Sequence, residues 1–154
     1  MTIMADSPAD RVEQAVAARL RSHDVRFTTT RRLVVRTLAG ARGPLAAGEL
    51  HQALPRAVPL SSLYRTLAVL EESLVLAKQH DDLGMGRYEL AEWLTGHHHH
   101  LVCESCGEVR DVTVSPETEQ TITALVSRLA SRAGYRATGH RIDIQGTCRA
   151  CRAL

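Results

Sequence analysis

Apolar positions recur every three or four residues through most of residues 8–74, which is the period of an amphipathic helix. This pattern predicts helices at 8–23, at 27–40 with threonine caps and a stop at Gly40, at 44–54, and from Pro59 to Leu74. We expect the last helix to bury one face, formed by Leu63, Leu67, Leu70 and Leu74. Two strand patterns, VLAKQ and RYEL, flank the turn HDDLGMG and predict a hairpin. Helices followed by a hairpin in this order predict a winged helix-turn-helix domain.

The second half of the chain has a different pattern, and the stretch AEWLTG at 91–96 looks like a linker. HHLVC, EVRDVTV and HRIDIQG are predicted strands. A helix is predicted between Ser115, which caps it ahead of Pro116, and Gly134. The predicted fold class is therefore α+β, with an N-terminal winged helix-turn-helix domain and a small C-terminal α/β domain. The predicted boundaries are 1–90 for the first domain, 91–96 for a hinge and 97–154 for the second domain.

Charge is unevenly distributed along the chain. The segment from Arg11 to Arg65 holds ten arginines and three acidic residues, although the net charge of the whole chain is only +2. A basic block of this kind suits a polyanion such as DNA. The alternative is an Arg-rich genome, because Lys78 is the one lysine. No apolar run approaches the ~18 residues of a membrane span, and no signal peptide is recognised, so we expect a cytoplasmic protein without membrane contact.

The start of the helix after Pro59 carries polar residues that would enter the major groove of double-stranded DNA in a winged helix-turn-helix domain. The candidates for DNA binding are Ser61, Ser62, Tyr64 and Arg65, together with Arg31 of the basic block. The alternative is that these groups only solvate an ordinary helix.

Two Cys-x-x-Cys pairs, Cys103/Cys106 and Cys148/Cys151, stand at opposite ends of the second domain. A two-residue spacer lets both sulfurs of a pair face one ion, so two pairs predict a closed structural zinc site. The alternatives are a thioredoxin-like redox pair, or iron held by the same sulfurs. A closed site of four thiolates leaves no open position for chemistry on a substrate.

A run of four histidines leads directly into the first of these pairs. Alternate side chains on a strand face opposite sides, so His98 and His100 share one face and His97 and His99 share the other. The run can therefore contribute to two different sites. Imidazole with carboxylate suits zinc, iron(II), manganese or nickel. The candidate partners are Glu89, Glu92, Asp111, Glu119 and His140. The alternative is a solvated cluster that binds adventitious metal.

Together these motifs resemble the ferric uptake regulator (Fur) family of bacterial metal-dependent repressors. The resemblance covers nearly the whole chain and rests, in order, on FTTTRRLVV, LSSLYRTLAVLEESLV, RYEL, HHHHLVCESCGEV and HRIDIQGTCRAC. AAGELHQAL, the histidine run and GTCRAC are most similar to the zinc uptake regulators of actinobacteria. The resemblance implies a homodimer, joined through the C-terminal α/β domain, that binds palindromic DNA operators when loaded with metal. It implies no small-molecule substrate beyond metal ions.

The resemblance also implies roles for particular residues. It implies structural zinc on Cys103, Cys106, Cys148 and Cys151. It implies a regulatory site at the hinge with the ligands Glu89, His98, His100 and Asp111. It implies a second regulatory site in the dimerisation domain with His97, His99, Glu119 and His140, and it matches Tyr64 to the tyrosine of the recognition helix.

Some positions depart from the family pattern. Pro44 stands where many iron and peroxide sensors carry a histidine, and Ala91 and Leu76 stand where actinobacterial zinc regulators carry a cysteine and an acidic residue. His80 or Glu92 is therefore an alternative to Glu89. We predict zinc as the sensed metal, with an iron, manganese or peroxide sensor as the alternative. A zinc metalloenzyme built on His98 and His100 is the rival of another class, although no substrate pocket is indicated.

Overall fold

The computed structural model describes residues 7–81 and 84–153. Two residues of the predicted hairpin turn, 82 and 83, and residues 1–6, on which the expectation about a signal peptide rests, lie outside this described part. The chain divides into two compact units between Gly96 and His97. A short helix, α5 (Glu92–Thr95), occupies the predicted hinge, and its Leu94 packs against the core of the first unit. The predicted domain boundaries and the hinge remain predictions.

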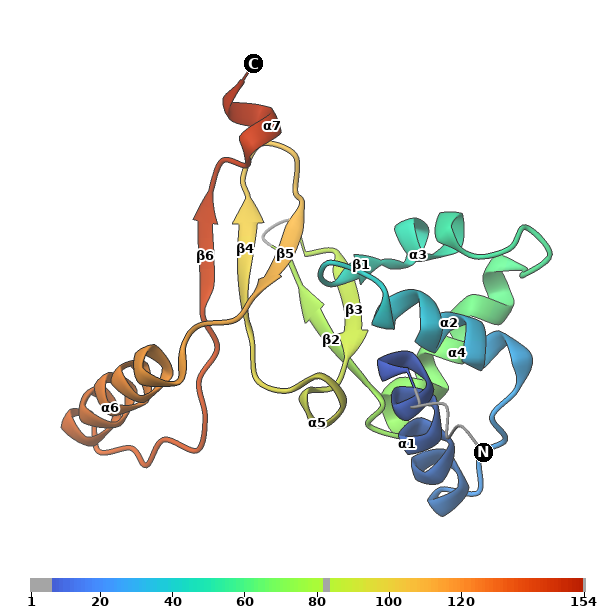
Figure 1. Cartoon of the computed structure of the whole chain (residues 1–154), viewed down its shortest axis with the longest axis horizontal. Coiled ribbons are helices and arrows are strands. Elements are labelled where there is room, and N and C mark those ends of the chain that lie inside the picture. Colours follow the sequence, from blue (N-terminus) through green and yellow to red (C-terminus); the bar gives the residue numbers. More distant parts are fainter. Residues whose placement is uncertain (1–6, 82–83, 154) are drawn as a thin grey trace, which may run out of the picture. The chain divides into compact units, whose positions relative to one another are not determined.

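In the described part of the first unit, four helices precede α5 (Figure 1). They are α1 (Pro8–Ser22), α2 (Thr29–Ala39), α3 (Ala47–Ala53) and α4 (Leu60–Glu72). Ser7 caps α1 and Thr28 caps α2, each by accepting a hydrogen bond from a backbone N–H in the first turn. Their apolar faces meet in one core, whose fully buried members include Val16, Leu20, Val34, Leu50, Leu63 and Leu67.

A three-stranded sheet completes the first unit. The strands β1 (Leu45–Ala46), β2 (Leu76–His80) and β3 (Gly86–Leu90) are antiparallel and lie in the order β1-β3-β2. The predicted helix at 44–54 begins only at Ala47, because Leu45 and Ala46 pair with Tyr88 and Arg87 of β3. This arrangement of helices and hairpin confirms the winged helix-turn-helix fold.

The prediction that Leu74 lies in the core is wrong, because this residue is 58% exposed. Helix α4 ends at Glu72, and Leu74 follows with φ of 57° in the left-handed region, which turns it away from the leucine face. The N–H groups of Leu74 and Val75 donate to the carbonyls of Glu71 and Leu70, which is the pattern of a Schellman cap. The Leu74 carbonyl accepts a hydrogen bond from Trp93 Nε1 of α5 at 2.7 Å.

The second unit is a three-stranded sheet with a long helix, α6 (Pro116–Arg132), and a short C-terminal helix, α7 (Arg149–Arg152). The strands β4 (His99–Cys103), β5 (Val109–Val112) and β6 (Asp143–Gly146) lie in the order β5-β4-β6. Strand β4 is antiparallel to β5 and parallel to β6, which places His100 opposite both Asp111 and Asp143. The chain therefore has the predicted α+β class, with a C-terminal α/β domain.

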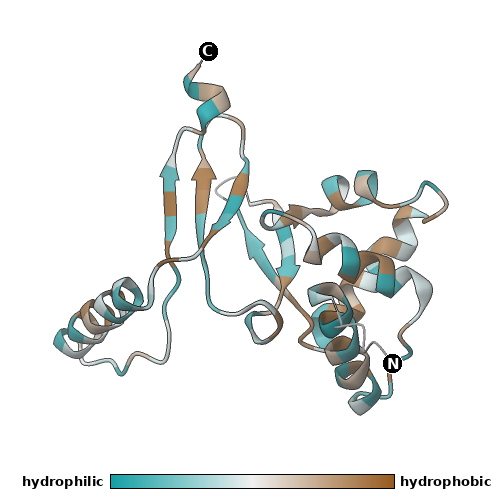
Figure 2. Ribbon diagram, viewed as in Figure 1, coloured by the Kyte–Doolittle hydropathy of each residue, from teal (hydrophilic) through white to brown (hydrophobic). Residues whose placement is uncertain are grey.

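Little of the second unit is buried. Among its described residues, only Cys103 and the three histidines 98–100 are buried. Helix α6 lies beyond the ends of the strands and buries none of its residues, although hydrophobic positions run along it and along β4 (Figures 1 and 2). Large apolar side chains are exposed on the helix, at Leu125 and Leu129, and on the sheet, at Leu101 and Ile144. In the described part of the chain, no helix is long and apolar enough to cross a membrane.

Candidate metal centres and nucleic-acid interface

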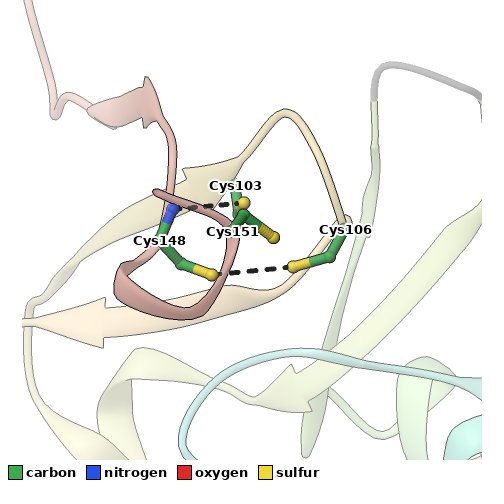
Figure 3. Close-up of side chains that lie close together, drawn as sticks. All are labelled: Cys103, Cys106, Cys148 and Cys151. Carbon is green, nitrogen blue, oxygen red and sulfur yellow. Dashed lines mark hydrogen bonds between the residues drawn. The ribbon is translucent and has the colours of Figure 1, made fainter. Parts of the chain in front are cut away.

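The four cysteines lie together at one end of the second sheet (Figure 3). Cys103 ends β4, and Cys106 follows in the turn. Cys148 is the N-cap residue of α7, and Cys151 lies within this helix. Their sulfurs lie within 4.8 Å of one another, and the Cys106 and Cys148 Sγ atoms are 3.9 Å apart. A zinc–sulfur bond of about 2.3 Å implies a tetrahedral sulfur–sulfur edge of about 3.8 Å. The structure therefore brings the predicted zinc ligands together at a spacing that fits this metal.

Electrostatics at the four sulfurs also favours a cation. The pKa of Cys103 is lowered to about 6, because the backbone N–H groups of Cys148 and Cys106 point at its sulfur. The crowding of the other thiols, Cys148 first among them, raises the pKa of Cys151 to about 12. The protein thus stabilises the Cys103 thiolate, while the surrounding thiols oppose the ionisation of Cys151, which a positive charge among the sulfurs would favour. A divalent metal ion supplies that charge.

A second cluster gathers three histidines around the carboxylate of Glu119, which lies in the first turn of α6. The Glu119 oxygens lie 2.9 Å from His99 Nε2, 3.0 Å from His140 Nε2 and 3.6 Å from His97 Nε2. The Nε2 atoms of His97 and His140 are 3.3 Å apart. Zinc–nitrogen bonds of about 2.0–2.1 Å imply tetrahedral edges of about 3.3–3.4 Å, so these four side chains fit one small cation.

On the other face of the histidine run, His98 and His100 converge on Asp111 of β5. Their Nε2 atoms lie 3.8 and 3.7 Å from Asp111 Oδ1, and their rings meet edge to face at 5.1 Å. These nitrogen–oxygen distances are wider than the ligand–ligand edge of about 3.3–3.4 Å in a tetrahedral zinc site. They leave room for further ligands around one ion. The alternation predicted from the sequence therefore distributes the four histidines between two clusters.

Asp143 on β6 contacts His100. Asp143 was not predicted from the sequence to be part of this site. Its Oδ1 lies 3.1 Å from His100 Nδ1, and its Oδ2 accepts a hydrogen bond from Arg141 at 2.7 Å. Burial opposes the ionisation of Asp143, but the hydrogen bonds from Arg141 and His100 outweigh it and lower the pKa. The sequence holds no local signal for this contact, because it depends on the parallel pairing of β4 with β6.

Glu89, the other predicted ligand for this site, belongs to the first unit. It lies on β3 opposite Ala77, and its carboxylate accepts a hydrogen bond from the side-chain amide of Gln79 on β2. The alternatives His80 and Glu92 lie at the end of β2 and the start of α5. Which of the three completes a site with His98 and His100 stays a prediction.

The candidate DNA-binding residues lie around the starts of α2 and α4. Ser61, Tyr64 and Arg65 are exposed in the first two turns of α4, while Leu63 between them is buried. A hollow in the first unit is lined from both helices, by residues that include Thr28, Arg31, Ser62 and Arg65. Neither helix has an acidic residue in its first turn, so the positive end of each helix dipole is not neutralised there. This surface suits a phosphate backbone.

Comparison with known proteins agrees with this arrangement. Residues 22–145 match the Ferric uptake regulator family. The Ferric uptake regulation protein of Neisseria meningitidis serogroup A is 34% identical over 96 residues, and the match spans only 62% of either chain, less than two thirds. The Peroxide-responsive repressor PerR of Staphylococcus aureus is 26% identical over 98% of both chains. A solved zinc-bound manganese uptake regulator is 27% identical, with a TM-score of 0.68 over 86% of this chain and 98% of its own. The chain belongs to the ferric uptake regulator family.

Proposed function

We propose that this protein is a metal-dependent transcriptional repressor that binds palindromic operators as a homodimer in the cytoplasm. The observation that carries the proposal is the division of the four histidines between two ligand clusters, directly after a winged helix-turn-helix domain. Relatives with regulator and repressor names support the class. An enzyme is set aside, because the chain belongs to a family of regulators.

We assign structural zinc to Cys103, Cys106, Cys148 and Cys151. Zinc in such a site cross-links the protein and neutralises the thiolates. The four cysteines join the end of β4 to α7, two segments that are more than 40 residues apart in the chain. Among the described residues of the second unit, Cys103 is the one buried apolar side chain, so this cross-link replaces part of a missing core.

We propose that the exposed apolar side chains of the second unit pack against a second copy of the chain. Full burial of an exposed Leu or Ile side chain contributes about 1.5–3 kcal/mol. Leu125 and Leu129 on α6, and Leu101 and Ile144 on the sheet, are about half exposed, so each would gain about half of that. A dimer that covers them supplies the core that one copy lacks. It also presents two recognition helices, as a palindromic operator requires.

The proposed switch is a two-state hinge. His98, His100 and Asp111 belong to the second unit, and Glu89, His80 or Glu92 would supply a ligand from the other side of the hinge. A metal ion held by both sides favours the arrangement that fits two half-sites. Binding about 100-fold tighter to that state supplies about 2.7 kcal/mol of bias. By linkage, DNA then raises the affinity for metal by the same factor.

We favour zinc as the sensed metal, with iron or manganese as the second candidate. The four histidines and the absence of a histidine at Pro44 support zinc. The carboxylate of Asp111 and the wide spacing around it support a harder ion with more oxygen ligands. A solved manganese uptake regulator that resembles this chain is bound to zinc, so the ion bound in that protein is not the ion in its name.

The experiment is an operator gel shift, with protein that retains only its four-cysteine zinc, titrated with buffered Zn²⁺, Fe²⁺ and Mn²⁺ without oxygen. We expect binding to appear at the lowest free concentration with zinc and to be lost in His98→Ala. Zinc must also act at a free concentration that a cell can use, because it outcompetes iron and manganese at most nitrogen–oxygen sites. Equal DNA binding with and without metal would contradict the proposed switch.

A further inference from the structure

The contact between Asp143 and His100 has a chemical consequence for the ring. An ionised carboxylate only accepts hydrogen bonds, so the contact of 3.1 Å requires that His100 Nδ1 carries the proton. In the neutral ring the lone pair is then on Nε2, which is the nitrogen that lies 3.7 Å from Asp111 Oδ1. The backbone of His100 is held as well, because its N–H donates a hydrogen bond to the Ile142 carbonyl at 3.1 Å.

Asp143 is itself held in place. Its second oxygen accepts a hydrogen bond from Arg141 at 2.7 Å, which leaves Oδ1 for His100. The parallel register of β4 and β6 places Asp143 directly opposite His100, so the contact follows from the sheet and needs no loop closure. His99, in the other cluster, differs: its buried Nδ1 has no hydrogen-bond partner among the described residues. A carboxylate thus supports the Nδ1 atom of His100, whereas His99 Nδ1 has no such support among the described residues.

We propose that Asp143 is a positioning residue for the regulatory metal site, because it holds His100 in the tautomer whose Nε2 faces the ligands. This inference rests on the proposed function, in which His98, His100 and Asp111 bind the sensed ion. A carboxylate behind a metal-binding histidine fixes the ring and makes its other nitrogen a stronger donor, and its loss commonly weakens metal binding about 10–100-fold. Arg141 acts one step further out, by holding Asp143.

The decisive variant is Asp143→Asn. Its amide replaces one of the two carboxylate oxygens with an NH2 group, so either Arg141 or His100 faces a donor where it now has an acceptor. Asp143→Glu tests whether a carboxylate at this position restores the function. The matched control is Glu108→Gln, because Glu108 also pairs with an arginine two residues away, Arg110 at 3.0 Å, but contacts no histidine in the described part of the second unit.

Two measurements test the proposal on protein that retains its four-cysteine zinc. In a chelator competition with Zn²⁺ and Mn²⁺, we expect Asp143→Asn to bind the regulatory ion about 10–100-fold more weakly, with partial recovery in Asp143→Glu and no change in Glu108→Gln. In long-range ¹⁵N–¹H spectra of protein without the regulatory ion, we expect His100 to carry its proton on Nδ1 in the wild type and to lose this preference in Asp143→Asn.

The outcomes separate this inference from the proposed function. If His100→Ala abolishes the binding of the regulatory ion but Asp143→Asn does not weaken it, the role of Asp143 is wrong and the metal switch stands. A proton on Nε2 of His100 in the wild type would also overturn the role of Asp143. If the wild type binds no ion beyond the four-cysteine zinc, the proposed function fails and this inference fails with it. Thermal melts and zinc content exclude a folding defect in each variant.

Discussion

The carboxylate of Glu13 on α1 is buried and accepts a hydrogen bond from the guanidinium of Arg36 on α2, with Arg32 binding its other oxygen. Two arginines of the basic block therefore join helices of the first unit. Glu13→Gln removes the charge that both arginines need. We expect the free energy of unfolding of the first unit to fall by about 1–2 kcal/mol, since both guanidinium groups keep solvent contact. Urea denaturation at neutral pH measures this loss.

The same variant has a predicted pH dependence. Burial opposes the ionisation of Glu13, but the hydrogen bonds from Arg36 and Arg32 outweigh it and hold its pKa below the ordinary value. A lowered pKa in the folded state stabilises the protein above the unfolded pKa of about 4.3, and this contribution disappears as the pH falls through the folded value. The difference between wild type and Glu13→Gln should therefore shrink in acid. Glu72→Gln, at an exposed carboxylate of α4, is the control and should show neither effect.

The four-cysteine site makes a prediction about stability. Cys103→Ser and Cys148→Ser each remove one sulfur ligand, so we expect loss of tightly held zinc and of dimerisation or thermal stability, because metal binding in such sites is coupled to folding. Metal analysis, sedimentation and thermal melts measure these losses. The control is Ser105→Ala, because Ser105 lies between Cys103 and Cys106 but is not a predicted ligand. This variant should behave as the wild type. A normally stable dimer without zinc would contradict a structural role.

The spacing of hydrophobic residues predicted the helices and strands, because secondary structure of this kind depends mainly on residues that are close in the chain. Strand β4 lies at the predicted HHLVC, and the buried leucines of α4 lie at the predicted helical spacing. The same spacing failed at Leu74, where the left-handed turn after Glu72 ends the helix and redirects the side chain. Helical periodicity carries no information about such a cap when its usual glycine is absent.

The residue types indicated which side chains could bind a metal ion, and the tertiary fold determines which of them are in contact. The division of the four histidines between two faces could be predicted from the sequence, because the side chains of a strand alternate with a period of two. The position of Asp143 beside His100 was not, because it requires the order of strands in the sheet. The burial of Glu13 against two arginines was likewise hidden, since the pairing of α1 with α2 is a tertiary contact.

The cluster around Glu119 makes a prediction about metal stoichiometry. Burial opposes the ionisation of Glu119, but the hydrogen bond from His99 and the charges of His97 and His140 outweigh it and lower its pKa. Glu119→Gln removes the one anionic ligand, so we expect one fewer divalent ion per chain in equilibrium dialysis. Glu117→Gln, two residues earlier on α6, should keep the wild-type stoichiometry. An unchanged ion count in Glu119→Gln would show that the cluster is held by hydrogen bonds alone.

The start of α4 makes the prediction about DNA. Tyr64→Ala and Arg65→Ala should weaken operator binding without changing metal content or dimerisation, because both side chains are exposed and the core of the first unit contains neither. If Arg65 contacts a guanine, the variant should lose about 1–3 kcal/mol of discrimination at one base pair. If Arg65 contacts only phosphate, binding should weaken evenly across sequences and the salt slope should decrease by about one.

The control for both variants is Arg136→Ala, which removes the same charge from an exposed position of the second unit. Operator affinity measured at several salt concentrations, on the cognate site and on single-base variants, separates the two contacts of Arg65. Arg31 lines the same hollow from α2. Arg31→Ala should therefore weaken operator binding further when combined with Arg65→Ala, by a similar factor for every DNA sequence, as expected for the loss of a phosphate contact. Wild-type affinity in Tyr64→Ala, Arg65→Ala and Arg31→Ala would mean that DNA is bound by another surface of the first unit.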